Sequence, residues 1–167
     1  MLIEEFDTMD TAAAREIVRS CADVPSWVDA VVAGRPYAET EELFARAGDL
    51  ARGWTGAEVQ QALAEHPRIG ERHAGSGTGA AMSAREQSGV DPADTDVRAL
   101  LAAANAAYEE RFDRIFLVRA AGRSAEEILA QLDERLGNDP GTELEVTAGQ
   151  LREIAALRLR ALFTVVS

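Results

Sequence analysis

The segment TELEVTAGQLREIAALRLRAL, residues 142–162, is the longest predicted helical segment in the chain. Its leucine and isoleucine side chains, several of them three residues apart, predict one continuous helix with an apolar stripe. The stripe comprises Leu144, Leu151, Ile154, Leu157, Leu159 and Leu162. Turn-forming residues from Asn138 to Gly141 precede it, so we expect this helix to start at Thr142 and to be central to the core.

Helical periodicity also dominates the rest of the chain, without alternating β-branched runs between hairpin turns. Four Ser/Thr-x-x-Glu patterns predict helix starts, because the hydroxyl accepts from a first-turn amide while the glutamate reaches back. They are Thr55 with Glu58, Ser83 with Glu86, Ser124 with Glu127, and Thr142 with Glu145. We predict an all-α fold, a compact bundle of about eight helices in a single domain over residues 1–167. The helices are expected near Thr11–Cys21, Ser26–Ala33, Thr40–Ala51, Thr55–Glu65, Met82–Ser88, Thr95–Arg111, Ser124–Leu136 and Thr142–Leu162.

The composition is acidic, with 29 Asp and Glu against 17 Lys and Arg and a formal net charge of −12. Such a charge opposes binding to polyphosphates, so no nucleic-acid partner is expected. No apolar run approaches the ~18 residues that span a bilayer, so no membrane partner is expected either. The single Cys21 cannot form an intrachain disulfide, and the acidic N-terminus lacks the features of a secretory signal. These features predict a cytoplasmic protein.

A small polar site is predicted around EHPRIGE, residues 65–71. Proline after His66 disfavours the α region for that histidine, so a helix ending near Glu65 should present the imidazole at its C-terminal edge. A histidine in this position can serve as a general acid or base. The alternative is a structural cation that interacts with the helix dipole.

Ser83, Glu86 and Gln87 should project to one side of the first turn of the helix expected at 82–88. The simpler interpretation is a capping box at the surface. In the alternative interpretation, Glu86 orients or shares a proton with His66, while Ser83 and free helix amides bind an anion or a carbonyl oxygen.

Arg158 lies inside the apolar stripe of the last predicted helix. Because arginine is rarely buried without a partner, it should form a salt bridge to Glu153 or another acid, or clamp a substrate carboxylate. The stretch GSGTG, residues 75–79, is expected to be a flexible lid or connector, since the pattern of a phosphate loop is missing. No metal site is expected, because His66 and His73 lack the spacing of zinc ligands and the one cysteine cannot complete a set.

Several motifs follow one another in a recognisable order. They are HPRIGE at 66–71, S-x-x-E-Q at 83–87, N-x-x-Y-x-x-R-F at 105–112 leading to FLV at 116–118, GRS at 122–124, RLGN at 135–138 and I-x-x-L-R-L at 154–159. This ordered set resembles the 2-oxo-4-hydroxy-4-carboxy-5-ureidoimidazoline (OHCU) decarboxylases of urate degradation, over nearly the whole chain.

The resemblance implies a cofactor-free, all-helical homodimeric enzyme that removes the carboxylate of a small ureide, OHCU, and delivers (S)-allantoin. It implies that His66 is the proton donor. The positions implied to bind substrate are Pro67, Ser83, Ala84, Arg85, Glu86, Gln87, Val118, Arg119, Ala120, Ala121, Gly122 and Arg158. Two departures are visible: Asp113 stands where the family usually has glycine, and Arg119 to Ala121 replace a more neutral stretch. We expect these departures to shift backbone contacts from 118 to 122.

The chemistry explains why these residue types belong together. Loss of carbon dioxide from a hydroxyl-bearing carbon leaves a carbanion, which an adjacent ring carbonyl can hold as an enolate. We expect Ser83 and helix amides to stabilise the oxyanion, and His66 to protonate carbon while Glu86 fixes its orientation.

Two other functions are weighed against this enzyme. One is a non-catalytic helical interaction module, and the other is a metal-dependent hydrolase that uses His66, His73 and Glu71. Convergence of His66, Glu86 and Arg158 in one cavity would favour the decarboxylase, whereas their dispersal would favour the module.

Overall fold

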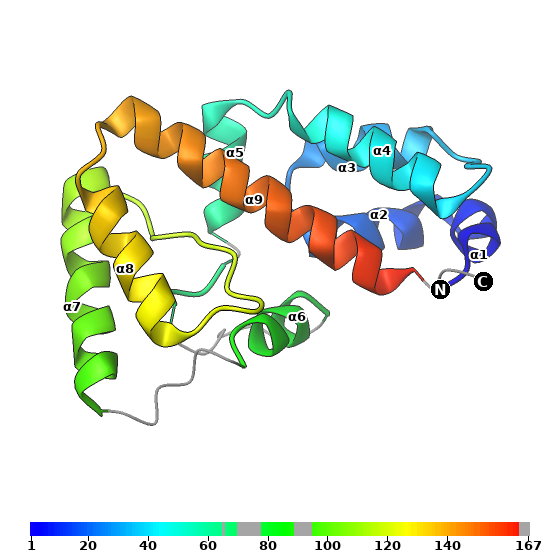
Figure 1. The fold of residues 1–167 in the computed structure, drawn as a ribbon. Helices are drawn as coiled ribbons and strands as arrows, with labels where there is room; N and C mark the ends of the chain where they lie inside the picture. Colours follow the sequence, from blue (N-terminus) through cyan, green and yellow to red (C-terminus); the bar gives the residue numbers. More distant parts are fainter. Residues whose placement is uncertain (65, 70–77, 89–94, 164–167) are drawn as a thin grey trace. The chain divides into compact units, whose positions relative to one another are not determined.

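The computed structural model describes residues 1–64, 66–69, 78–88 and 95–163. These residues form nine α-helices and no β-strand, which confirms the predicted all-α fold. Figure 1 labels the helices, which are α1 (Ile3–Thr8), α2 (Thr11–Cys21), α3 (Pro25–Ala33), α4 (Thr40–Ala51), α5 (Gly56–Leu63), α6 (Thr78–Glu86), α7 (Thr95–Phe112), α8 (Ala125–Leu136) and α9 (Pro140–Leu162). Every predicted helix has a counterpart, and α1 is additional.

The short helix α1 was missed because it is only six residues long. Ile3 and Phe6, three residues apart, are its buried residues, and the first turn is acidic. A Glu5 carboxylate oxygen accepts a hydrogen bond from the Leu2 amide at 2.8 Å. Tertiary burial of Ile3 and Phe6 therefore stabilises a helix that is too short to be stable by itself.

The chain divides into two compact units. Unit 1 comprises Met1–Ala62 and Arg152–Ser167, and unit 2 comprises Leu63–Leu151. Helix α9 contributes its first part to unit 2 and its second part to unit 1. The single domain over residues 1–167 stays a prediction.

In unit 1, α2 packs against α3, and α3 packs against α4. The ring of Phe163 meets the ring of Phe6 at 5.4 Å and that of Phe44 at 6.1 Å, both edge to face. The indole N–H of Trp27 donates to the carbonyl of Ala47 at 2.9 Å. The aromatic core of unit 1 is therefore built from α1, α3, α4 and the residue after α9.

In unit 2, α7 and α8 lie side by side (Figure 1) and enclose an aromatic and aliphatic core. Tyr108 is central to it, with ring centroids of Phe112 and Phe116 at 4.7 and 5.3 Å. The buried members of this core are Ile69, Leu101, Tyr108, Phe112, Phe116, Val118, Ala120, Ala125, Ile128 and Leu132.

A buried polar cluster, which we call the Arg135 cluster, comprises Tyr108, Arg135, Asn138, Glu143 and Thr147. Glu143 has no exposed surface, and Arg135 is 5% exposed. One Glu143 oxygen accepts from Arg135 Nε at 2.7 Å and from the Tyr108 hydroxyl at 2.6 Å, while the other accepts from Asn138 Nδ2 at 3.0 Å. Arg135 also donates to the Thr147 hydroxyl at 3.2 Å. Burial raises the pKa of Tyr108, and its hydrogen bond to Glu143 raises it further, so the phenol remains a donor.

Two of the four predicted capping boxes are confirmed. The Glu58 amide donates to the Thr55 hydroxyl at 3.2 Å, and the Thr55 amide donates back to the Glu58 carboxylate at 3.0 Å. Ser124 and Glu127 exchange the same pair of hydrogen bonds, at 3.2 and 3.3 Å.

The box predicted at Thr142 is wrong, because α9 begins two residues earlier, at Pro140. Asp139 accepts from the Thr142 amide at 2.9 Å and from its hydroxyl at 2.7 Å. These hydrogen bonds lower the pKa of the Asp139 carboxyl. An aspartate followed by proline in the first turn is a strong helix start, and it displaces the weaker signal at Thr142.

The box predicted at Ser83 is also wrong, because α6 runs from Thr78 to Glu86 and Ser83 lies inside it. Ser83 is only 3% exposed, so it belongs to the buried side of the helix. Two alanines at 80 and 81 favour extension of the helix toward its N-terminus. Thr78 and Gly79, predicted to be part of a flexible lid, are therefore helical, and residues 75–77 lie outside the described residues.

The predicted apolar stripe of α9 needs one correction. Leu151, Ile154 and Leu159 are buried, but Leu157 is 42% exposed. At about 100° per residue, Leu157 points roughly 130° away from the centre of the buried face. Its apolar character was mistaken for burial.

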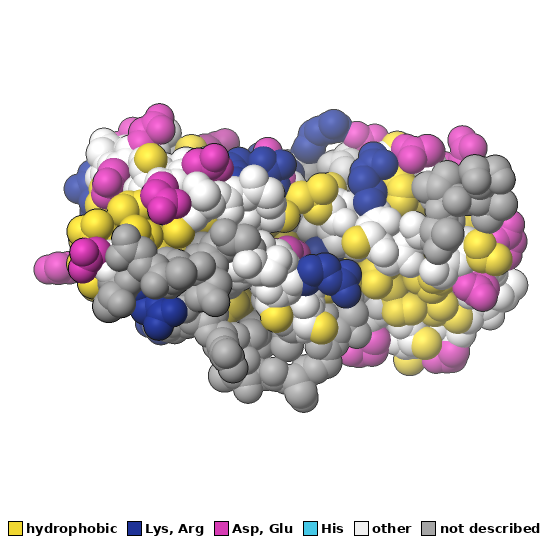
Figure 2. All heavy atoms as spheres, turned by 60° about the horizontal axis from the view of Figure 1, so that its bottom comes forward, with side chains coloured by type: hydrophobic (Ala, Val, Ile, Leu, Met, Phe, Trp, Pro, Cys, Tyr) yellow, Lys and Arg dark blue, Asp and Glu magenta, His cyan; other side chains and the backbone are white. Residues whose placement is uncertain are grey.

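Charged side chains are mixed on the face drawn in Figure 2. Arginine side chains lie there in small groups among carboxylates and apolar side chains.

Removal of one partner from the Arg135 cluster should be strongly destabilising. Glu143→Leu leaves the guanidinium of Arg135 buried without its charge partner, and we expect a loss of about 3–5 kcal/mol in the free energy of unfolding. Urea denaturation measures this loss.

Two comparisons separate an unpaired charge from a general packing defect. Glu145→Leu, at an exposed position of the same helix, should change stability by no more than about 0.5 kcal/mol. The double variant Glu143→Leu with Arg135→Met should be more stable than Glu143→Leu alone, because no buried charge remains unpaired. A double variant that is as unstable as the single one would contradict this explanation.

Candidate active site

His66 lies just after the end of α5, as the sequence predicts. The helix ends at Leu63, and the His66 amide donates to the Leu63 carbonyl at 3.0 Å. The side chain is partly buried, as is that of Pro67. The imidazole is thus held in a turn that follows a helix, where a histidine can take part in acid–base chemistry.

The turn that contains His66 is fixed to α7 by polar contacts. Asn105, buried in α7, donates from Nδ2 to the carbonyl of Ile69 at 3.2 Å. Both Nε and Nη2 of Arg68 contact the carboxylate of Glu109, at 2.5 and 3.3 Å. Ile69 itself is buried in the core of unit 2. Residues 66–69 are therefore held by side chains on a long helix rather than by their own backbone alone.

The Ser83–Gln87 element forms the end of α6 and the residue after it. Ser83 is buried, Ala84 and Arg85 are exposed, and Glu86 and Gln87 are partly buried. The Gln87 amide donates to the Ser83 carbonyl at 3.1 Å. Ser83 thus offers a hydroxyl on the buried side of a helix rather than at the predicted helix start.

The third predicted element, Val118 to Gly122, lies in the connection between α7 and α8, where the described residues 113–124 form neither helix nor strand. This connection has a positive φ at Asp113 (54°) and again at Gly122 (76°). Val118 and Ala120 are buried, Arg119 and Ala121 are partly buried, and Gly122 is exposed. A Cβ at Gly122 would meet nothing within 4 Å, so the glycine is needed for its left-handed backbone rather than for space.

Side chains of two helices supply partners to the backbone of this connection. Arg135 Nη1 donates to the Leu117 carbonyl at 2.5 Å, and the Arg119 amide donates to Oε1 of Gln150 at 2.9 Å. Sequence reasoning did not identify Arg135 or Gln150 as functional residues. The available signal was the spacing of Glu143, Thr147 and Gln150, which places three polar residues on one face of a helix at i, i+4 and i+7.

Arg158 belongs to unit 1, where it is 5% exposed. Its Nη1 donates to the Ser20 carbonyl at 3.2 Å, in the last turn of α2. A cation at that place interacts favourably with the C-terminal carbonyls of a helix. The salt bridge to Glu153 and the substrate clamp both stay predictions, as does the convergence of Arg158 with His66 and Glu86.

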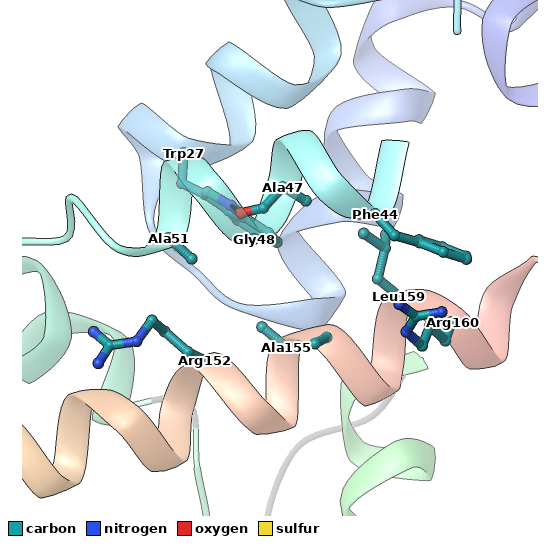
Figure 3. Close-up of a pocket in the computed structure, with 10 residues that line it drawn as sticks. Trp27, Phe44, Ala47, Gly48, Ala51, Arg152, Ala155, Leu159 and Arg160 are labelled. Atoms are coloured by element: carbon teal, nitrogen blue, oxygen red, sulfur yellow. Dashed lines mark hydrogen bonds between the residues drawn. The ribbon is translucent and has the colours of Figure 1, made fainter. Parts of the chain in front are cut away.

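A pocket in unit 1, drawn in Figure 3, contains none of the predicted site residues. It lies along α4 and α9, with Ala155 facing α4 between Arg152 and Arg160. Its lining residues are Trp27, Phe44, Ala47, Gly48, Ala51, Arg152, Ala155, Ala156, Leu159 and Arg160. We assign no chemistry to it.

Within the described residues, no group of three His, Cys, Asp or Glu side chains is arranged to hold a metal ion. His73 and Glu71, the other residues weighed for a metal-dependent hydrolase, lie outside the described ranges.

Comparison with known proteins assigns the chain to an enzyme family. A family model for OHCU decarboxylase matches residues 7–160. The 2-oxo-4-hydroxy-4-carboxy-5-ureidoimidazoline decarboxylase of Amia calva is 33% identical over 146 residues, covering 86% of this chain and 82% of that protein. The enzyme of the same name from Mus musculus is 36% identical over 149 residues, covering 86% and 80%.

The fold agrees with these sequence matches. A solved structure of OHCU decarboxylase in the presence of (S)-allantoin has a TM-score of 0.73 and 25% sequence identity, covering 87% of this chain and 95% of that chain. The chain is thus an all-α enzyme of the carboxy-lyase class. It belongs to the OHCU decarboxylase family.

Proposed function

We propose that the chain catalyses the cofactor-independent decarboxylation of OHCU to (S)-allantoin in urate degradation, with His66 as the proton donor. Membership of the OHCU decarboxylase family over residues 7–160 is the observation that carries this proposal. The relatives from Amia calva and Mus musculus are named for this decarboxylation.

The reaction needs one bond to break and one proton to be delivered. The bond between C4 and its carboxylate breaks, carbon dioxide leaves, and the electron pair forms a C4=C5 double bond while the former C5=N1 pair takes up a proton at N1. The C4 hydroxyl loses its proton, so its oxygen carries the charge as an enolate and an external electron sink is not required. His66 then protonates C5 from one face as C4 becomes a carbonyl, and Glu86 fixes the orientation of the imidazole. Delivery from one face makes the product a single enantiomer.

The described geometry supports these roles. The turn with His66 is fixed to α7 through Ile69 and Arg68, which limits the directions in which the imidazole can point. Ser83, buried in unit 2, is proposed to stabilise the enolate oxygen, and the role proposed for Arg158 of unit 1, to hold a carboxylate or ureido group, rests on the family resemblance. Pro67, Ala84, Arg85, Gln87 and residues 118–122 complete the proposed substrate contacts.

We further propose that the protein is a cytoplasmic homodimer. Each of the described helices is too short or too polar to cross a membrane. Cys21, the single cysteine of the sequence, is buried and forms no disulfide within the chain, which suits a reducing compartment. The homodimer rests on the family resemblance. Sedimentation equilibrium should give twice the 17.9 kDa mass of the chain, and a monomer at micromolar concentration would contradict it.

The purified protein should convert freshly generated OHCU to (S)-allantoin. Circular dichroism measures this conversion and reports its rate and its stereochemistry together. Loss of the proton donor should abolish this stereospecific step. We expect His66→Asn to keep its fold and thermal midpoint but to lose about 10²–10⁴-fold in rate.

His73→Asn is the matched control, because His73 is the only other histidine of the chain. It should keep parental activity, whereas a metal-dependent hydrolase that uses both histidines would lose activity in both variants. Glu86→Gln should lower the rate more than the stability. A His66→Asn variant within a few-fold of the parent would refute the assignment of the proton donor.

Arg158→Lys tests the proposed substrate clamp. Lysine can still donate to the Ser20 carbonyl at the end of α2, but a point charge cannot reproduce the planar fork of a guanidinium. We therefore expect a raised KM for OHCU with a small change in thermal midpoint. Arg160→Lys, at an exposed position two residues further on, should change neither. Unchanged KM and kcat in Arg158→Lys would show that Arg158 does not clamp substrate and that its role is the structural contact with α2.

A further inference from the structure

The connection between α7 and α8 is buried without being part of a sheet. Phe116, Leu117, Val118 and Ala120 are at most 5% exposed, and residues 113–124 form neither helix nor strand. Buried backbone N–H and C=O groups must nevertheless find partners, because each unsatisfied group costs about 1–3 kcal/mol. One partner is local, since the Arg123 amide donates to the Ala120 carbonyl at 3.1 Å, and side chains supply others.

Two side chains supply these partners on either side of Val118. Arg135, from α8, donates to the carbonyl of Leu117, the residue before Val118. Gln150, from α9, accepts from the amide of Arg119, the residue after it. A two-point attachment across one residue fixes the direction of both adjoining peptide planes, and hence the N–H and C=O groups that the segment can present.

The donor at Arg135 is itself rigid. Its guanidinium is held by Glu143 and Thr147 and lies 4.5 Å from the ring centroid of Phe116. Gln150 follows Thr147 by three residues on α9, so both acceptors belong to the same face of that helix. A side chain that is already ordered loses little further entropy when it binds the segment, which makes the attachment more effective.

We propose that Arg135 and Gln150 are positioning residues for substrate, which hold the backbone of Val118 to Gly122 in the geometry that binds OHCU. This inference rests on the proposed function, in which that segment contacts the substrate. Neither residue needs to touch the substrate or to take part in proton transfer.

Gln150 is the residue to vary, because it is only partly buried and carries no charge. Gln150→Leu removes the acceptor for the Arg119 amide and should lower kcat/KM for OHCU about 10- to 100-fold, mainly through KM, since a displaced binding segment loses favourable contacts. Gln150→Glu keeps an acceptor oxygen and should restore kcat/KM to within a few-fold of the parent. Gln131→Leu is the matched control, the same substitution on α8 at a partly buried position.

Backbone amide hydrogen exchange at Arg119 gives a second readout. A general loss of stability would increase exchange at many amides and not selectively at Arg119. The amide should lose protection in Gln150→Leu but keep it in Gln150→Glu and Gln131→Leu. Equal kcat/KM in Gln150→Leu and Gln131→Leu, or unchanged protection of Arg119 in Gln150→Leu, would overturn the inference. If instead the parent protein does not turn over OHCU, the proposed function fails, whereas the exchange data still decide whether Gln150 holds the segment.

Discussion

The full burial of the Glu143 carboxylate is the constraint on which the arrangement of unit 2 depends. A carboxylate without exposed surface must be paired and hydrogen-bonded, or its desolvation would outweigh nearby gains. Arg135, Tyr108 and Asn138 provide these partners, and they come from α8, from α7 and from the turn before α9. Few alternative packings of these elements would satisfy the carboxylate. We infer that the cluster contributes more to the choice of one arrangement than to net stability.

The same physical device recurs at two of the predicted substrate segments in unit 2. A side chain on a regular helix binds the backbone of an irregular segment: Asn105 binds Ile69 next to the histidine turn, and Arg135 and Gln150 bind the connection after α7. Irregular backbone can present N–H and C=O groups to a ligand, because no helix or sheet partner consumes them. Such backbone is useful for binding only if something else holds it still, and helix side chains do so here.

The sequence predicted most helices because apolar periodicity and local capping reflect interactions between near neighbours. Thr55 and Ser124 begin their helices as predicted, since both partners of each box lie within one turn. The starts of α6 and α9 were misplaced where a stronger neighbouring signal, such as Asp139 before proline, competed with the box. Burial of Ser83 and exposure of Leu157 depend on tertiary packing, which no local pattern contains. The family resemblance identified His66 and Glu86 as candidates. The hydrogen-bond partners of Arg135, by contrast, are 8 to 18 residues away along the chain, and no motif gave that pairing.

Both departures from the resembled family pattern, Asp113 and Arg119 to Ala121, lie in the connection between α7 and α8, and the shift of backbone contacts expected from them stays a prediction. Asp113 adopts φ 54°, in the left-handed region that favours glycine, and aspartate is one of the few other residues that tolerate it. Asp113 therefore meets a conformational requirement that a glycine at this place would also meet. Arg119 is held through its amide by Gln150, so the identity of its side chain does not enter that hydrogen bond. A segment that is held through its backbone can vary in its side chains while Arg135 and Gln150 keep the same backbone partners.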